Sequence, residues 1–195
     1  MSVCRKLFAL VAMLALVLLC ACSTQEAAPK SGNGFPMSDM SGYAALEGYD
    51  GELQFYDLTV KDIEQLMADG ESFAFIAAFA NCPWCNQCIV QLNDIAIAEG
   101  VQVGYLNTRL DPSWKSNIDI DDYDTFVELF GDYLKEDEDG ILHLYTPHTF
   151  FIKDGAVVYE HSGSVEGAND PSQPLSEEQV RELEAKFREG FAKIK

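Results

Sequence analysis

The sequence is poor in basic residues, with 13 Lys and Arg against 32 Asp and Glu. Residues 1–21 hold two of the basic residues and no acidic one, so the rest of the chain has 11 against 32 and a formal charge of −21. Binding to phosphates or anionic headgroups needs clustered Lys and Arg. We therefore expect no nucleic acid partner. The acidic surface either keeps the protein soluble or favours basic client peptides.

The sequence also lacks a comfortable membrane span. Its apolar run from Leu7 to Ala21 is too short for one and is typical of an export signal. The run ends in Leu19-Cys20-Ala21-Cys22, which resembles the lipobox of bacterial lipoproteins, with Cys22 as the lipidated residue. Cys20 departs from the usual Ala, Ser or Thr, and an ordinary cleaved secretory signal is the alternative. We expect a lipid-anchored protein on the extracytoplasmic face of a bacterial cell membrane, where disulfides persist.

Composition divides the chain into three parts. We expect a signal peptide over residues 1–21, a flexible tether over 22–51 that starts at the lipidated Cys22, and one folded domain over 52–195. The tether region is rich in Ser, Gly, Ala and Pro and has no sustained periodicity. The remaining length, with its Phe, Leu, Ile and Val, suffices for one hydrophobic core, and we expect a monomer.

The folded part alternates strands and helices. Thr59 and the pair Ser176 and Gln179 are expected to begin helices, Gly70 and Gly100 to end them, and Asp154-Gly155 to join a hairpin. The expected strands are 53–58, 73–79, 101–107, 150–153 and 156–161, and the expected helices are 59–70, 82–100, 123–134 and one from 176 onward. The order is βαβαβαββα.

Three cysteines open the second helix directly behind an apolar strand, and the first two form Cys82-Pro83-Trp84-Cys85. A two-residue gap at the first turn lets two sulfurs meet and cycle between dithiol and disulfide. With Thr146-Pro147, the following hairpin and the terminal helix, this motif resembles the thioredoxin-like superfamily over about residues 53–192. The resemblance implies an α/β thioredoxin-like fold, a central mixed β-sheet flanked by helices, with a cis-proline at Pro147 beside the cysteines.

Position and resemblance together assign roles to the site. Cys82, at the exposed N-terminal edge of the helix, has its thiolate stabilised by free N–H groups and is expected to be the nucleophile. Cys85 lies one turn inward and would resolve the mixed disulfide. In the family, the backbone before the cis-proline pairs with the client, so Thr146 and Pro147 are predicted to bind substrate. For Pro147, a rigid turn without a client role is the alternative.

The residues between the cysteines are also candidates for client contact. Pro83 fixes φ early in the helix, which suits the first turn. Trp84 either forms part of an apolar rim that touches the client or packs over the helix start. We expect a thiol–disulfide oxidoreductase, running in either direction, that acts on protein or peptide thiols and disulfides and needs no cofactor.

The sequence departs from thioredoxin at three positions. Thioredoxins usually carry a buried acidic residue six positions before the first cysteine, where this chain has Ile76; Asn81 replaces an aromatic residue, and Val90 replaces a proline. These differences suggest a specialised extracytoplasmic branch, similar to bacteriocin-transport accessory proteins, with a membrane-bound redox partner. The competing hypothesis is a non-enzymatic accessory module whose cysteines form only a structural disulfide.

Cys88 extends the motif to C-x-x-C-x-x-C, a spacing also used by iron–sulfur proteins. Such clusters usually need a fourth thiolate, and His148 is the residue that could complete a zinc site instead. Because both ligand sets are incomplete, we expect no metal. Cys88 is assigned to the core, where unpaired cysteines are common.

Overall fold

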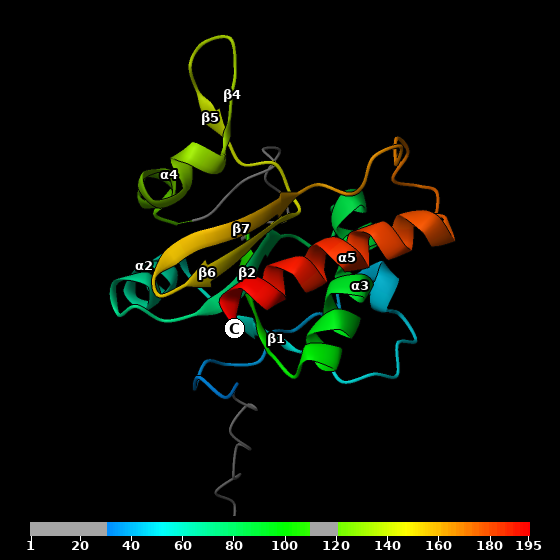
Figure 1. The fold of residues 1–195 in the computed structure, drawn as a ribbon. Helices are drawn as coiled ribbons and strands as arrows, with labels where there is room; N and C mark the ends of the chain where they lie inside the picture. The colour runs from blue at the N-terminus through cyan, green and yellow to red at the C-terminus, as the bar shows by residue number, and fades with distance from the viewer. Residues whose placement is uncertain (1–30, 110–120) are drawn as a thin grey trace, which may run out of the picture.

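A five-stranded mixed sheet runs through the part of the chain that the computed structural model describes, residues 31–109 and 121–195 (Figure 1). Its strand order is β1-β3-β2-β6-β7; β1, β3 and β2 are parallel, and β6 is antiparallel to both of its neighbours. The strands are β1 (Phe55–Asp57), β2 (Phe73–Ala78), β3 (Val103–Asn107), β6 (His148–Lys153) and β7 (Ala156–Ser162). This is the predicted thioredoxin-like fold.

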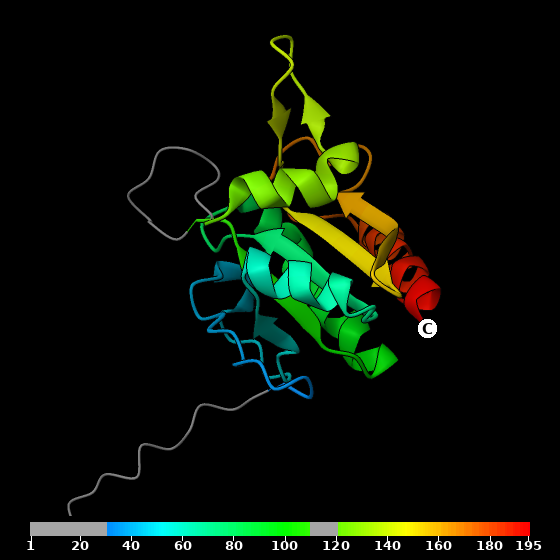
Figure 2. The same cartoon turned by 90° about the vertical axis from the view of Figure 1, so that its left-hand side faces the viewer.

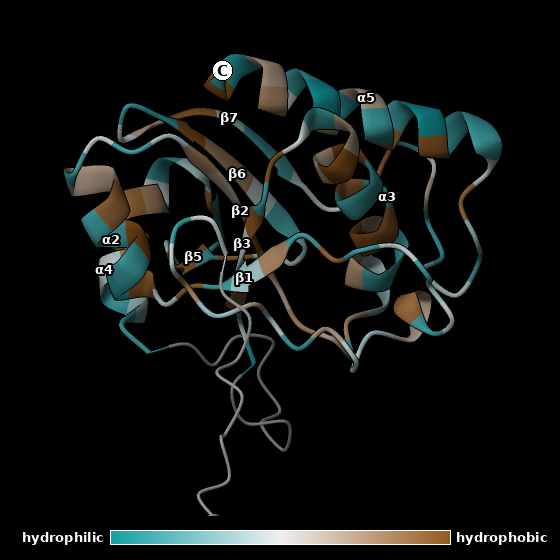
Figure 3. Cartoon of the chain, turned by 90° about the horizontal axis from the view of Figure 1, so that it is seen from below, coloured by the Kyte–Doolittle hydropathy of each residue, from teal (hydrophilic) through white to brown (hydrophobic). Residues whose placement is uncertain are grey.

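Helices cover both faces of the sheet and enclose two hydrophobic clusters (Figures 1 and 2). The first cluster contains the cysteines and side chains of α3 (Pro83–Glu99) and α5 (Glu177–Ile194). The second contains side chains of α2 (Val60–Ala68) and α4 (Tyr123–Phe130). Strand β2 is buried along its whole length, as expected for a central strand that helices cover on both faces. Figure 3 shows hydrophobic colours along the central strands and hydrophilic colours over much of α5.

The predicted helix boundaries are mostly confirmed, because local signals set them. Thr59 forms a capping box at α2, and Ser176 forms one at α5. Gly100 ends α3 with φ 67°, a left-handed conformation that glycine adopts without steric strain. The helix predicted over 123–134 is shorter than expected: α4 ends at Phe130 and continues as the 3-10 helix η2 (Gly131–Tyr133).

The sequence predicts one of two hairpins and not the other. The turn between β6 and β7 has φ 50° at Asp154 and 77° at Gly155, the positive values that this dipeptide predicts. The second hairpin, β4 (Lys135–Glu136) with β5 (Leu142–His143), was not expected and projects from the body next to α4 (Figures 1 and 2). Its strands are two residues each, too short for an alternating pattern to appear in the sequence.

Residues 31–51, which composition assigned to a flexible tether, pack against the domain. Met40 and Tyr43 are buried in the first cluster, and Met37 forms a bridge with Tyr56. The 3-10 helix η1 (Ala44–Leu46) lies against α3. A few apolar side chains anchor this stretch despite its Ser and Gly content, so the folded part includes it. The predicted signal peptide and Cys22 lie outside the described residues, within which no helix is long and apolar enough to cross a bilayer.

Candidate functional site

Cys82 is the N-cap of α3, and its sulfur takes the place of a capping oxygen. The backbone N–H of Cys85 donates to Cys82 Sγ at 3.2 Å. Hydrogen bonding from Cys85, first its thiol and then its backbone, lowers the pKa of Cys82 to about 7, although burial acts in the opposite direction. A thiolate at this position is therefore well populated at neutral pH.

Cys85 has the opposite character. It is fully buried, and burial raises the pKa of its thiol strongly. Both cysteines are free thiols here, together with Cys88. The pair thus combines one ionisable sulfur with one protonated sulfur, which is the asymmetry that a nucleophile and a resolving thiol require.

The exposed position expected for Cys82 is not what the structure has, because the residue is only 4 % exposed. The loop that contains Thr146 covers it. The Cys82 thiol donates to the Thr146 carbonyl at 3.7 Å, and the Thr146 hydroxyl lies 3.8 Å from Cys82 Sγ. A helix position alone does not show what a distant loop places over it.

The Thr146-Pro147 peptide bond is cis, as the resemblance implies. Strand β6 begins at the next residue, and His148 is the partner of Ala77 near the end of β2. Since Cys82 follows β2, this pairing brings the proline loop to the cysteines. Thr146 is half-buried, Pro147 is buried, and their role in binding substrate stays a prediction.

The residues between the cysteines have unequal exposure. Pro83 is exposed, whereas Trp84 is half-buried and packs against the first hydrophobic cluster. This contact agrees with the packing alternative for Trp84 and leaves part of its indole at the surface. Tyr145, which sequence analysis did not single out, is 52 % exposed beside Thr146. Its position directly before the Thr-Pro pair was the signal available.

Asn86 is a second residue that sequence analysis missed. Its amide nitrogen donates to the carbonyls of Ala80 at 2.7 Å and Cys82 at 3.0 Å. Its amide oxygen accepts from the backbone N–H of Ala45 at 2.9 Å. One side chain therefore fixes the turn before the first cysteine and ties the 31–51 segment to α3.

Ile76 is buried on the sheet face that carries the cysteines. Its partner on β3 is Tyr105, whose hydroxyl accepts a hydrogen bond from Tyr43 at 3.2 Å. Both tyrosines belong to the same hydrophobic cluster as Cys82 and Cys85. Tyr105 therefore lies beside Ile76 on the neighbouring strand, and Tyr43 adds a second phenol next to it.

No family model and no curated protein matches this sequence. Solved structures similar to the chain include the thioredoxin of Fasciola hepatica, at 20% identity and TM-score 0.39, covering 70% of this chain and 95% of that one. The reduced desulfothioredoxin of Desulfovibrio vulgaris Hildenborough is similar at 18% identity and TM-score 0.36, covering 68% and 89%. The fold assignment above rests on the strand order and helix placement of the chain itself.

Cys88 does not join the cysteine pair. It is buried, its thiol donates to the Gly163 carbonyl at 3.5 Å, and burial raises its pKa to about 12. His148 packs on Phe150 in the second cluster, on the other face of the sheet, and pairs with Glu160 at 2.6 Å. Within residues 31–109 and 121–195, no group of three or more His, Cys, Asp or Glu side chains could hold a metal ion.

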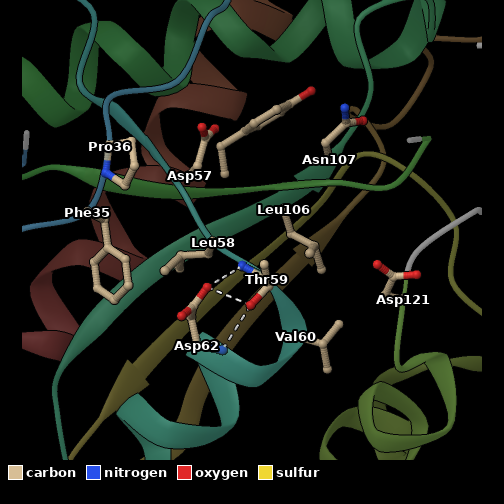
Figure 4. Close-up of a pocket in the computed structure, with 11 residues that line it drawn as sticks. Phe35, Pro36, Asp57, Leu58, Thr59, Val60, Asp62, Leu106, Asn107 and Asp121 are labelled. Atoms are coloured by element: carbon tan, nitrogen blue, oxygen red, sulfur yellow. Dashed lines mark hydrogen bonds between the residues drawn. The ribbon is translucent and has the colours of Figure 1, made fainter. Parts of the chain in front are cut away.

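A cavity of about 490 Å³ opens at the carboxyl ends of β1 and β3 (Figure 4). Figure 4 shows Leu58 and Leu106 along it, with the carboxylates of Asp57 and Asp121 at its margins. Tyr105 also lines it. Tyr105 also belongs to the hydrophobic cluster that contains the cysteines.

Proposed function

We propose that this protein is a thiol–disulfide oxidoreductase that acts on protein or peptide disulfides through Cys82 and Cys85. The observation that carries the proposal is the Cys82 sulfur at the N-terminus of α3, with a pKa lowered to about 7 and the Thr146 loop against it. Thiolate is the reactive form in disulfide exchange, so a cysteine that ionises near neutral pH is suited to begin it.

In the reductive direction, the Cys82 thiolate attacks one sulfur of a client disulfide. A Cys82–client bond forms, the client disulfide breaks, and the first client thiolate leaves and takes up a proton. Cys85 then loses its proton and attacks Cys82 Sγ, which forms the Cys82–Cys85 disulfide and releases the second client thiol. Two electrons pass from the protein dithiol to the client. The oxidative direction runs the same steps in reverse.

The client would lie along the Thr146 loop. An extended chain can form β-type hydrogen bonds with the backbone there, next to the sulfur that it must reach. Pro83, the surface part of Trp84 and Tyr145 would supply apolar contacts around the sulfur. The contact between the Thr146 carbonyl and the Cys82 thiol would give way as the client sulfur approaches.

The cellular setting of the proposal rests on the sequence of residues 5–22. We propose lipidation at Cys22, an extracytoplasmic membrane-anchored location, a membrane-bound redox partner and a monomeric domain. A specialised branch similar to bacteriocin-transport accessory proteins fits the isoleucine at position 76, where thioredoxins have a carboxylate. Detergent phase partitioning of the native protein and of a Cys22→Ala variant tests the anchor, because only the lipidated native protein should enter the detergent phase.

Trapping tests the proposed reaction. In Cys85→Ser, the mixed disulfide on Cys82 has no resolving thiol, so client proteins should stay linked and appear as reducible adducts in the native host. The matched control, Cys82→Ser/Cys85→Ser, keeps the serine at 85 and removes the nucleophile, so its adducts should disappear. Recovery of the same amount of adduct from both variants, or of none from either, would count against the proposal.

One observation favours the non-enzymatic alternative, a binding module with a structural disulfide: both cysteines are buried. The two functions differ in reduction potential. A working pair equilibrates with glutathione buffers, whereas a structural bridge has a potential below about −300 mV and resists them. Titration of the full-length protein in such buffers separates the two.

A further inference from the structure

Resolution of the mixed disulfide requires Cys85 to lose its proton inside the core. Burial makes that loss unfavourable, since Cys85 is fully buried and its pKa is raised. Ile76 offers no carboxylate to help it. This difficulty arises only if the cysteine pair reacts, so the inference rests on the proposed function.

The polar side chains around Cys85 come from four parts of the chain. Tyr43 comes from the 31–51 segment, Tyr105 from β3, Thr146 from the cis-proline loop, and Cys82 from the start of α3. The two tyrosines are 2 % and 6 % exposed, and their hydroxyls are 3.2 Å apart. They belong to the same hydrophobic cluster as Cys82 and Cys85, and negative charge on either cysteine raises the pKa of both phenols.

We propose that the Tyr43–Tyr105 hydroxyl pair replaces the missing carboxylate as a positioning group that stabilises the Cys85 thiolate during resolution. Only one of the two hydroxyl protons is used within the pair, so the second remains available to face a developing negative charge. In the low dielectric of a core, such a dipole acts more strongly than in water. In the part of the chain that the structure describes, no hydrogen bond joins either hydroxyl to Cys85. The electrostatic stabilisation of the thiolate therefore acts across the core.

The pair is suited to donate a proton in a hydrogen bond, and not to accept the proton of Cys85. Burial is the main cause that raises the pKa of Tyr43 strongly and the pKa of Tyr105 to about 12. Negative charge on the cysteines acts in the same direction, and the hydrogen bond from Tyr43 opposes it at Tyr105. Both phenols therefore stay protonated at neutral pH. The proton that Cys85 loses ends on the departing client thiolate, while the electron pair of the Cys85 thiolate forms the new bond to Cys82 and the Cys82–client bond breaks.

The inference also gives a role to the 31–51 segment. Tyr43 reaches the site because the 31–51 segment packs on the domain. The side-chain oxygen of Asn86 holds this segment by accepting a hydrogen bond from the N–H of Ala45, two residues away from Tyr43. A chain with a free tether at these positions would have Tyr105 without its partner. Packing of the segment and resolution by Cys85 should therefore be coupled.

A chromogenic aryl disulfide separates the two chemical steps in the full-length reduced protein. The first chromophore is released when Cys82 attacks, and the second when Cys85 resolves the adduct. In Tyr43→Phe, Tyr105→Phe and the double variant, the second phase should slow roughly three- to tenfold, because the hydroxyl dipoles that stabilise the Cys85 thiolate across the core are lost. Its pH profile should move to higher pH, while the first phase changes little. Because the hydroxyls act as a pair, the double variant should resemble the single ones.

Tyr56→Phe is the matched control, since it removes the hydroxyl of a buried tyrosine in the second cluster, on the other face of the sheet. It should leave both phases unchanged. Cooperative unfolding transitions should first show that all the variants are folded. The inference is then overturned if the second phase and its pH profile in Tyr43→Phe match those of Tyr56→Phe. Absence of the first phase in the unmodified protein would instead reject the proposed function, so the two failures are distinguishable.

Discussion

The Thr146 carbonyl oxygen lies 3.7 Å from Sγ of Cys82, although the two residues are 64 positions apart. Pairing of β6 with β2 produces this contact, because both residues lie just beyond the ends of paired strands. The same loop covers Cys82 and contributes to the ionisation of its thiol. One loop therefore limits access to the sulfur and also adds to the hydrogen bonding that favours its ionisation.

The first prediction concerns the pH dependence of Cys82. Because hydrogen bonding from Cys85 lowers the pKa of Cys82 to about 7, its rate of alkylation should rise with pH and reach half its maximum near that value. Iodoacetamide labelling of the Cys85→Ala/Cys88→Ala variant leaves one cysteine of the domain to follow, and the alanine at position 85 removes the side-chain hydrogen bond to Cys82. Its midpoint should therefore lie above that of the Cys88→Ala protein. Equal midpoints would contradict the assigned cause.

The second prediction concerns the 31–51 segment. The N–H of Ala45 donates to Asn86, and the N–H of Asp57 donates to the Pro36 carbonyl. In hydrogen exchange, these amides should be protected from solvent, whereas a flexible tether would exchange at once. Asn86→Ala should remove the protection of Ala45 and destabilise the domain by about 1–3 kcal/mol.

Gln65→Ala is the control for that substitution. Gln65 is an exposed residue of α2 whose side chain donates to Asp69 at the C-cap of the same helix. Its loss should change the free energy of unfolding by about 0.5 kcal/mol or less. If Ala45 exchanges as fast in the unmodified protein as in Asn86→Ala, the segment does not pack as described.

The third prediction concerns the His148–Glu160 pair. The hydrogen bond from His148 is the main cause that lowers the pKa of Glu160 below its ordinary value of 4.5. A carboxylate with a depressed pKa adds stability above its unfolded pKa, and that stability is lost as the pH falls through the folded pKa. Glu160→Gln should therefore reduce the free energy of unfolding at pH 7 by roughly 1 kcal/mol or less, since the carboxylate is partly exposed.

Urea unfolding at several pH values measures this effect. The difference between the unmodified protein and Glu160→Gln should shrink as the pH falls below 4.5. Glu182→Gln is the control, because Glu182 forms a surface pair with Lys186 one turn along α5. A difference for Glu160→Gln that persists undiminished in acid would show that the pair does not act through ionisation.

Local sequence signals predicted most of the elements, and long-range contacts decided the site. The capping residues Thr59 and Ser176 and the Asp154-Gly155 turn act within a few positions, so the sequence alone located them. The Tyr43–Tyr105 contact joins residues 62 positions apart, and one of them lies in a stretch whose Ser and Gly content indicates a tether. No spacing rule connects them.

The burial of Cys82 follows the same logic. The motif correctly predicted that the sulfur would begin α3, but its exposure depends on where the Thr146 loop lies. The resemblance supplied the cis-proline, and it did not supply the extent of the cover. Exposure of a site residue depends on side chains that pack over it from elsewhere in the chain, and periodicity contains no information on them.

The last prediction restores the carboxylate that this chain lacks. Ile76 is fully buried, so Ile76→Asp should destabilise the domain by several kilocalories per mole and should raise the pKa of the new carboxyl. If the domain stays folded, that carboxyl lies on the same face as Cys85 and can accept its proton. The double variant Ile76→Asp/Tyr43→Phe should therefore recover much of the rate that Tyr43→Phe loses in the second phase of aryl disulfide exchange. Ile76→Asn, similar in shape but unable to take up a proton, is the control, and equal recovery by both would show that proton transfer from Cys85 does not limit resolution.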